Sequence, residues 1–224
     1  MAAFTLLEES RAKRAVELLA NEYKDAKYYL SFSTPVELLV AAILSAQTRD
    51  EVVNAVTPEL FKRYKTARDF AHAGEQDLVK YVRRVSFAGN KAKNIINACK
   101  ILMDRYGGEV PKRMEELVEL PGIGRKTANT ILINAYGIVE GIPVDTWVIK
   151  LSGRIGLSNS ADPDKIEQDL ERVADRKLWK NFAYVLKTHG KKVCQSRVPV
   201  CSQCLIGPNS KNRICPQNGV KTSK

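Results

Sequence analysis

Hydrophobic side chains recur along most of the chain at spacings of three and four residues, which is the period of an amphipathic α-helix. The clearest apolar stripe consists of Ala128, Ile131, Leu132, Ala135 and Tyr136. It predicts a packed helix over residues 126–136. A second stripe consists of Ala92, Ile95, Ile96, Cys99 and Met103. It predicts a long helix over residues 91–106, which Gly107 and Gly108 would end.

Helix-start signals and weaker stripes predict the remaining elements. Thr34, Pro35 and Glu37 form a capping box with proline at the first helical position, and this box opens a helix that runs through Ala46. Further helices are expected over residues 50–64, 66–72, 75–84, 114–120 and 145–155, from 162 onward, and in a last segment that ends at His189 with Gly190 as its stop. Only residues 138–144 resemble a strand, and no window keeps a two-residue alternation. The pattern therefore predicts an all-α fold.

The composition is that of a globular protein. The chain has 224 residues, of which 44% are hydrophobic and 27% charged, and this length suits one large domain or two small lobes. Its longest apolar run, Leu38–Leu44, is far shorter than the roughly 20 residues that cross a bilayer. Because residues 1–9 have no basic head and no long apolar stretch, we expect no secretory signal, no membrane association and a cytoplasmic location.

The charge balance gives the first indication of function. Thirty-six Lys and Arg residues against 25 Asp and Glu residues give a net charge of +11, and the isoelectric point is near 9.4. A protein this basic usually binds a polyanion, and nucleic acid is the commonest one. A generally basic surface with no ligand is the alternative reading.

The five cysteines are unevenly placed. Cys99 falls on the apolar stripe of a predicted helix, so we expect it to be a small buried residue. The other four are Cys194, Cys201, Cys204 and Cys215, with six, two and ten residues between them. In the reducing cytosol, four cysteines in a loop without periodicity indicate a metal site. Spacing alone leaves structural zinc and a four-iron cluster both open, and neither histidine is needed as a ligand.

A tight connection between two predicted helices is a candidate anion site. Pro121, Gly122, Ile123 and Gly124 would form a hairpin after which the next helix begins. Free backbone N–H groups and the positive end of a helix dipole bind anions, and in a basic protein the expected anion is a DNA phosphate. A plain helix–helix turn is the alternative, but Arg125 and Lys126 directly after the turn favour the phosphate site.

Two residues near the hairpin are candidates for chemistry. Lys126 stands in the first turn of a helix, where a cation opposes the helix dipole. It is either a surface lysine that touches phosphate or a nucleophile; the helix N-terminus, Arg125 and apolar packing would lower the pKa of its amine. Asp145 opens the next helix, and from the residues alone it is predicted to be an N-cap rather than a catalyst.

Taken together, these motifs resemble the endonuclease III family of helix-hairpin-helix (HhH-GPD) DNA glycosylases. The resemblance is carried by the segment 120–129 (LPGIGRKTAN), by Val144-Asp145-Thr146 and by the C-terminal four-cysteine loop. Four further segments match the family in the same order: 44–47, 90–94, 107–111 and 189–190. The resemblance covers nearly the whole chain.

The resemblance implies a bifunctional DNA glycosylase and AP lyase of base excision repair. Its substrate would be double-stranded DNA carrying oxidised pyrimidines or abasic sites, with the damaged base flipped out of the duplex. The lysine at the Lys126 position would attack C1′ of the sugar, displace the base and form a Schiff base that allows β-elimination and strand nicking. The carboxylate at the Asp145 position would stabilise positive charge on the sugar.

The resemblance also implies an architecture and a cofactor. One six-helix lobe would span residues 28–139, and a second, discontinuous lobe would contain residues 1–27 and 140–224, with the substrate cleft between them. Gln47 and Phe87 would insert into the duplex, although Phe87 has the alternative of a buried core aromatic. Cys194, Cys201, Cys204 and Cys215 would hold a [4Fe-4S] cluster, with zinc as the alternative, and the protein would act as a monomer.

The sequence departs from the family pattern in three places. Ten residues separate Cys204 from Cys215 where the family usually has five, which weakens the assignment of Cys215 as a ligand. Trp147 stands where the family often has histidine. Around Phe87, the residues Ser86 and Ala88-Gly89 differ from the family's usual glycine-first, aromatic-rich loop, so the lesion preference is expected to shift.

Two rival functions stay open on the sequence. Adenine- and mismatch-specific glycosylases share the hairpin and the cluster, but they generally lack a lysine at the Lys126 position and so remove bases without nicking. A non-enzymatic hairpin module with a structural metal would also bind DNA. Lys126 and Asp145 together argue against such a module, since binding alone requires neither.

Overall fold

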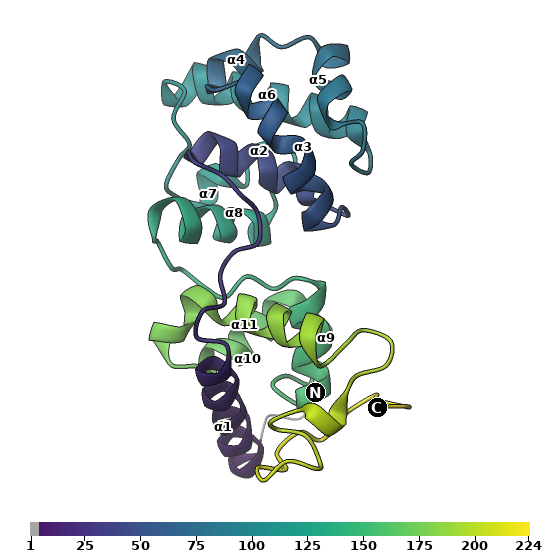
Figure 1. The fold of residues 1–224 in the computed structure, drawn as a ribbon. Helices are drawn as coiled ribbons and strands as arrows, with labels where there is room; N and C mark the ends of the chain where they lie inside the picture. The colour runs from purple at the N-terminus through teal and green to yellow at the C-terminus, as the bar shows by residue number, and fades with distance from the viewer. Residues whose placement is uncertain (1–4) are drawn as a thin grey trace. The chain divides into compact units, whose positions relative to one another are not determined.

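The computed structural model describes residues 5–224, and these residues form helices and loops without a β-strand (Figure 1). The all-α prediction is therefore confirmed for the described chain. The chain divides into two compact units. We call Tyr29–Glu140 the hairpin unit, and the described residues up to Tyr28 together with Gly141–Lys224 the cysteine unit.

The hairpin unit is built from seven α-helices and a short π-helix. They are α2 (Pro35–Ser45), α3 (Asp50–Arg63), α4 (Ala67–Ala71), α5 (Glu75–Val82), α6 (Ala88–Tyr106), α7 (Met114–Leu117), α8 (Arg125–Ile131) and the π-helix η1 (Leu132–Tyr136). Helix α6 packs against α2, α4 and α5, and α2 also packs against α3 and α8. Residues 38–44 of α2 are all buried, as expected for a helix that is apolar all round.

The cysteine unit packs four longer helices around a second core. They are α1 (Leu6–Glu22), α9 (Thr146–Ile155), α10 (Pro163–Val173) and α11 (Trp179–Lys192), with 3-10 turns η2 (Arg176–Leu178) and η3 (Cys201–Gln203). Phe182 and Leu186 of α11, Leu19 of α1 and Leu151 of α9 are fully buried in this core. Helix α1 begins with a capping box in which Thr5 and Glu8 exchange hydrogen bonds.

Two segments differ from the reading of the sequence because of packing contacts. Residues 138–144 form no strand; this connection instead buries Ile142 and Val144 in the apolar core of the cysteine unit. Helix α11 continues past Gly190 to Lys192. A Cβ at Gly190 would lie 2.4 Å from Cε3 of Trp147, so this glycine permits a close side-chain contact and does not end the helix.

Two further differences concern helix starts and ends. The predicted helix 126–136 begins one residue earlier and changes to π-helical geometry at Leu132. Helix α6 begins at Ala88, three residues before the prediction. Cys99 lies on α6 and is fully buried, as predicted, and burial raises the pKa of its thiol to about 12. Among the described helices, none combines the length and the apolarity needed to cross a membrane.

Candidate functional site

The connection between α7 and α8 is a tight hairpin that only glycine permits at one position. Gly122 has φ +84°, a left-handed conformation that side chains disfavour. A Cβ there would also lie 3.0 Å from Nδ2 of Asn94. Ile123 is buried and its N–H donates to the carbonyl of Leu120 at 3.0 Å. These contacts fix the turn on the body of the hairpin unit.

At Gly124, two residues later, the backbone conformation does not require glycine. It is the N-cap of α8 with φ −99°, which any residue adopts, and a Cβ added to it would meet nothing within 4 Å. No side chain of the described residues caps this helix end. The start of α8 therefore offers backbone N–H groups and an open approach to them, which is what an anion from outside the protein requires.

Arg125 and Lys126 are the first two residues of α8, and both are exposed. The carbonyl of Lys126 accepts a hydrogen bond from the Thr130 hydroxyl at 2.9 Å, so the backbone at the lysine is held from within its own helix. Because Lys126 is exposed, it does not lie in the apolar core of the hairpin unit. Gly124, the cap of the helix, and the cation Arg125 directly precede it.

Asp145 is the N-cap of α9, as predicted. Its Oδ1 atom accepts hydrogen bonds from the N–H groups of Trp147 and Val148, each at 2.9 Å. Both bonds use the same oxygen, and Oδ2 accepts none from the described residues. The side chain is half-buried. One carboxylate thus fixes its own orientation with Oδ1 and keeps Oδ2 for another partner.

The two residues that the resemblance assigns to the duplex both occupy strained positions. Gln47 has φ +53° and Phe87 has φ +56°, values that non-glycine residues rarely adopt. Gln47 follows α2 and is exposed, and Phe87 is the N-cap of α6 with 63% of its surface exposed. The alternative reading of Phe87 as a buried core aromatic is therefore wrong.

A buried lysine that sequence reasoning missed lies between these two segments. Lys91 of α6 is only 6% exposed, and its Nζ donates to the carbonyls of Leu44 (2.7 Å) and Ala46 (2.5 Å) and to Oγ1 of Thr48 (2.8 Å). Burial lowers the pKa of Lys91 to about 8. A signal existed in the sequence, because Lys91 stands one turn before Ile95 on the apolar stripe of α6.

The four C-terminal cysteines surround one cavity in the cysteine unit. Cys194, Cys201, Cys204 and Cys215 all line it, together with Arg154 and His189. None of the four forms a disulfide. Among the described residues, no three His, Cys, Asp or Glu side chains are arranged to hold a single metal ion. What the structure shows of the four cysteines is that they line one cavity.

The long segment between the third and fourth cysteines folds back on itself. The carbonyl of Ile206 accepts hydrogen bonds from the N–H groups of Ile214 (3.1 Å) and Cys215 (2.8 Å). The residues between them are looped out, so Cys215 reaches the cavity in spite of the extra length. Burial raises the pKa of Cys204 to about 11 and also raises that of Cys215, so these thiols need a cation to become thiolates at neutral pH.

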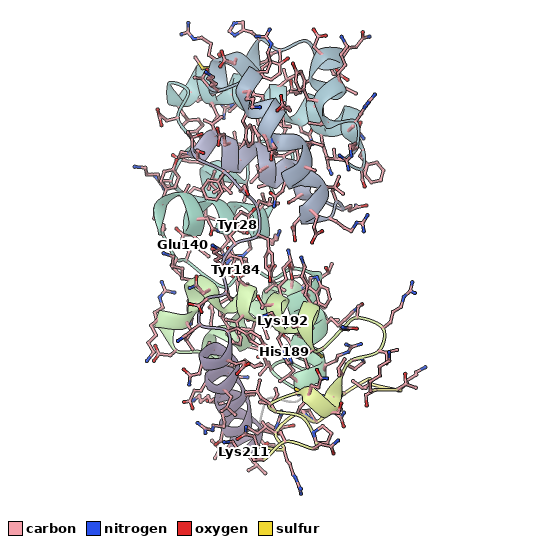
Figure 2. All side chains as sticks on the ribbon, viewed as in Figure 1. Tyr28, Glu140, Tyr184, His189, Lys192 and Lys211 are labelled. Carbon is pink, nitrogen blue, oxygen red and sulfur yellow. The ribbon has the colours of Figure 1, made fainter. Side chains whose placement is uncertain are left out.

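Side chains from α9 and α11 support the cysteine loop. Arg154 of α9 donates to the carbonyls of Gln195 and Ser196, each at 2.8 Å. His189 of α11, labelled in Figure 2, is almost fully buried, with Nδ1 3.1 Å from the hydroxyl of Tyr23 and Nε2 3.7 Å from Sγ of Cys204. Burial lowers the pKa of His189 to about 4, so the ring is neutral at physiological pH.

The chain is similar to known DNA repair proteins over most of its length. A family model described as the HhH-GPD superfamily base excision DNA repair protein matches residues 40–176. The chain is 44% identical over 209 residues to endonuclease III of Synechocystis sp., with 93% of each chain covered. It is 36% identical to endonuclease III of Bacillus subtilis, with 89% of this chain and 91% of that protein covered.

A solved structure is also similar over nearly the whole chain. It is a trapped endonuclease III–DNA covalent intermediate, and it matches with a TM-score of 0.86 at 32% sequence identity. The match covers 96% of this chain and 97% of that chain.

Proposed function

The chain belongs to the HhH-GPD superfamily of base excision DNA repair proteins and to its endonuclease III family of bifunctional glycosylase/lyases, and we propose that Lys126 and Asp145 carry its chemistry. The proposed substrate is double-stranded DNA with an oxidised pyrimidine or an abasic site. Removal of the base and nicking of the strand would both proceed through one covalent bond to lysine.

The observation that carries the proposal is the position of Lys126. An exposed primary amine stands in the first turn of α8, directly behind a hairpin whose cap residue leaves its backbone open to an external group. A phosphate at that helix start would bring the neighbouring sugar within reach of the amine. The similar solved structure is a covalent protein–DNA intermediate, which is the kind of species that this lysine would form.

We assign a sequence of covalent steps to the Nζ amine of Lys126. The neutral amine attacks C1′, and the base departs with the electron pair of the glycosidic bond. The sugar ring opens to give an imine between Nζ and C1′. Removal of a proton from C2′ then expels the 3′ phosphate, and water releases the lysine. Each step needs a primary amine, because a guanidinium or an amide cannot form the imine.

Asp145 suits the charge that develops on the sugar. Breaking a glycosidic bond passes through an oxocarbenium-like state, which a nearby carboxylate stabilises. The side chain is held by two backbone N–H groups through Oδ1 alone. We propose that Oδ2 faces the sugar in the complex and that the cap bonds supply the preorganisation.

Binding of the duplex is assigned to the hairpin, to Arg125 and to the two strained residues. The net charge of +11 favours a polyanion, and Gly122, Gly124 and Arg125 are proposed to hold one backbone phosphate without reading sequence. Gln47 and Phe87 are proposed to enter the duplex where the damaged base leaves it. The exposure of Phe87 supports this role, since an apolar side chain in water gains by insertion between bases.

We propose that Cys194, Cys201, Cys204 and Cys215 hold a [4Fe-4S] cluster in the cysteine cavity. In such a cluster each thiolate binds a different iron, which fits four cysteines that line one cavity. In a zinc site all four sulfurs lie about 2.3 Å from one ion. When bound, the cluster would crosslink the loop. Arg154 and His189 would orient the cysteines.

Borohydride reduction tests the proposed function. Purified protein incubated with a thymine glycol duplex and sodium borohydride should give a stable protein–DNA adduct, and without borohydride it should nick the strand. Base removal without adduct or nicking would favour the rival monofunctional glycosylase. Binding without base removal would favour a DNA-binding module. We expect the enzyme to act as a monomer on the DNA of the cell.

A further inference from the structure

A network of hydrogen bonds around Lys91 connects the segment of Gln47 to the segment of Phe87. The ammonium group has three N–H bonds, and the three acceptors described above use all of them. Two of these acceptors, Ala46 and Thr48, flank Gln47 on either side. The third, Leu44, lies in the last turn of α2, where carbonyl groups lack partners within the helix and the dipole favours a cation.

Thr48 extends the network to the second segment. Its Oγ1 accepts one hydrogen bond from Lys91 and another from the N–H of Ser86 at 3.1 Å. Ser86 directly precedes Phe87. The backbone of Lys91 completes the loop, because its N–H donates to the carbonyl of Phe87 at 3.0 Å. Both residues that are proposed to enter the duplex are therefore bracketed by atoms of one network.

Both residues beside the network have strained backbone conformations. Gln47 and Phe87 are both left-handed without being glycine, and such conformations persist only where the surroundings determine them. Neither side chain is packed in the core, since both residues are exposed. The hydrogen bonds of Ala46, Thr48 and Ser86, which stand beside the two residues, therefore hold the adjoining backbone in place.

We propose that Lys91, acting through Thr48, is a positioning residue that holds Gln47 and Phe87 in the conformations needed for extrusion of a damaged base. The inference rests on the proposed function. It gives a buried cation a role that does not involve contact with the substrate. Preorganised side chains lose less conformational freedom on binding, so a duplex would be opened at lower cost.

Thr48→Val is the main test, because valine keeps the shape of the half-buried side chain and removes only the shared hydroxyl. Thr48→Ser is its matched control, since serine keeps the hydroxyl. We expect Thr48→Val to slow single-turnover excision from a thymine glycol duplex about tenfold, the effect of losing one well-placed hydrogen bond. Nicking of an abasic-site duplex, which has no damaged base to extrude, should stay within about twofold of wild type. Thr48→Ser should resemble wild type in both reactions.

A second background separates positioning from general destabilisation. In a Gln47→Ala/Phe87→Ala protein, adding Thr48→Val should have little further effect on excision, because residues that act through one another are not additive. If Thr48→Val instead slowed excision by the same factor in this background as in wild type, the inference would be overturned. In the otherwise wild-type protein, an equal loss of excision and of abasic-site nicking, or no loss of either, would also overturn it. Lys91→Met removes the cation itself. It should slow excision from the thymine glycol duplex more than Thr48→Val does, and nicking of the abasic-site duplex should again be affected less.

Amide hydrogen exchange tests the network without reference to activity. The Ser86 amide should exchange faster in Thr48→Val than in wild type, while amides in the core of α6 should not change. Unchanged exchange at Ser86 would contradict the network. Absence of borohydride trapping in wild type would overturn the proposed function. Excision from the thymine glycol duplex by Thr48→Val at the wild-type rate would overturn only this inference.

Discussion

The starts of helices α8 and α9 differ in how their backbone N–H groups find partners. Every helix begins with N–H groups that lack partners within the helix. At α9 the chain satisfies two of them with its own carboxylate, through Oδ1 of Asp145. At α8 the N-cap is Gly124, no described side chain caps the helix, and the first two residues are the cations Arg125 and Lys126.

This difference indicates what each end is for. A carboxylate at a helix start is stabilised by the dipole, so α9 holds an anion of the protein in a fixed orientation. Cations at a helix start oppose the dipole, and an uncapped end costs stability, so α8 gains only when an anion arrives from outside. We infer that α8 is built for a DNA phosphate and α9 for a developing cation.

Removing the amine at α8 should have the largest effect. Lys126→Gln should abolish both borohydride trapping and strand nicking, because no imine can form, while duplex binding persists. Lys126→Arg keeps the charge and should also fail, since guanidinium is always protonated. Gel assays of nicking alongside binding titrations measure both properties. Normal nicking of a thymine glycol duplex by Lys126→Gln would contradict the role of Lys126.

Neutralising the carboxylate at α9 should have the next largest effect. Asp145→Asn should slow base release by about 10²–10³-fold, since a neutral amide cannot stabilise a cationic sugar. Asparagine is as good an N-cap as aspartate, so the thermal midpoint should not fall. Asp145→Ala should in addition lose about 1 kcal/mol of folding stability. A parallel loss of rate and stability across these variants would mean that Asp145 is a cap only.

Adding a side chain at the open helix start should weaken binding moderately. Gly124→Leu should fold normally, because its Cβ meets open space, yet lose about tenfold in affinity for every duplex if it blocks one phosphate contact. The logarithm of affinity should fall linearly with the logarithm of salt concentration, with a smaller slope in the variant. Loss of affinity for one lesion alone would contradict a phosphate site.

Disrupting the cysteine loop should have the smallest effect on the chemical step. Arg154, which donates hydrogen bonds to this loop, follows Asp145 by nine residues, or about 14 Å along α9 at about 1.5 Å per residue. Cys201→Ala should lower iron content, stability and DNA affinity, while single-turnover rates at saturating enzyme change little. Wild-type protein prepared anaerobically should be yellow-brown. Stoichiometric zinc without iron would contradict the assignment of a cluster.

Much of the fold followed from local pattern. The apolar stripes predicted the buried faces of α6 and α8, and Asp145 was recognisable as a cap from its place before α9. The family motifs added the candidate site residues. The N-terminal helix α1 was not identified from its stripe, although Ala12, Val16 and Leu19 lie on one buried face.

What the sequence did not predict depends on contacts between distant segments. Lys91 looked like one of 36 basic residues, and only the fold brings its ammonium group to the carbonyls that follow α2. Gly190 resembles a helix stop in the sequence, but in the fold it makes room for the side chain of Trp147. Phe87 had two readings that only its exposure distinguished. Local propensity cannot decide such cases, because the partner comes from elsewhere in the chain.

Mapping the covalent bond to DNA tests the central claim most directly. The wild-type protein is trapped with borohydride on a thymine glycol duplex, digested with a protease and a nuclease, and analysed by mass spectrometry. The account predicts one modified peptide that contains the segment 125–129, with the sugar remnant on Nζ of Lys126. A remnant on any other lysine, or on the N-terminal amine, would contradict it.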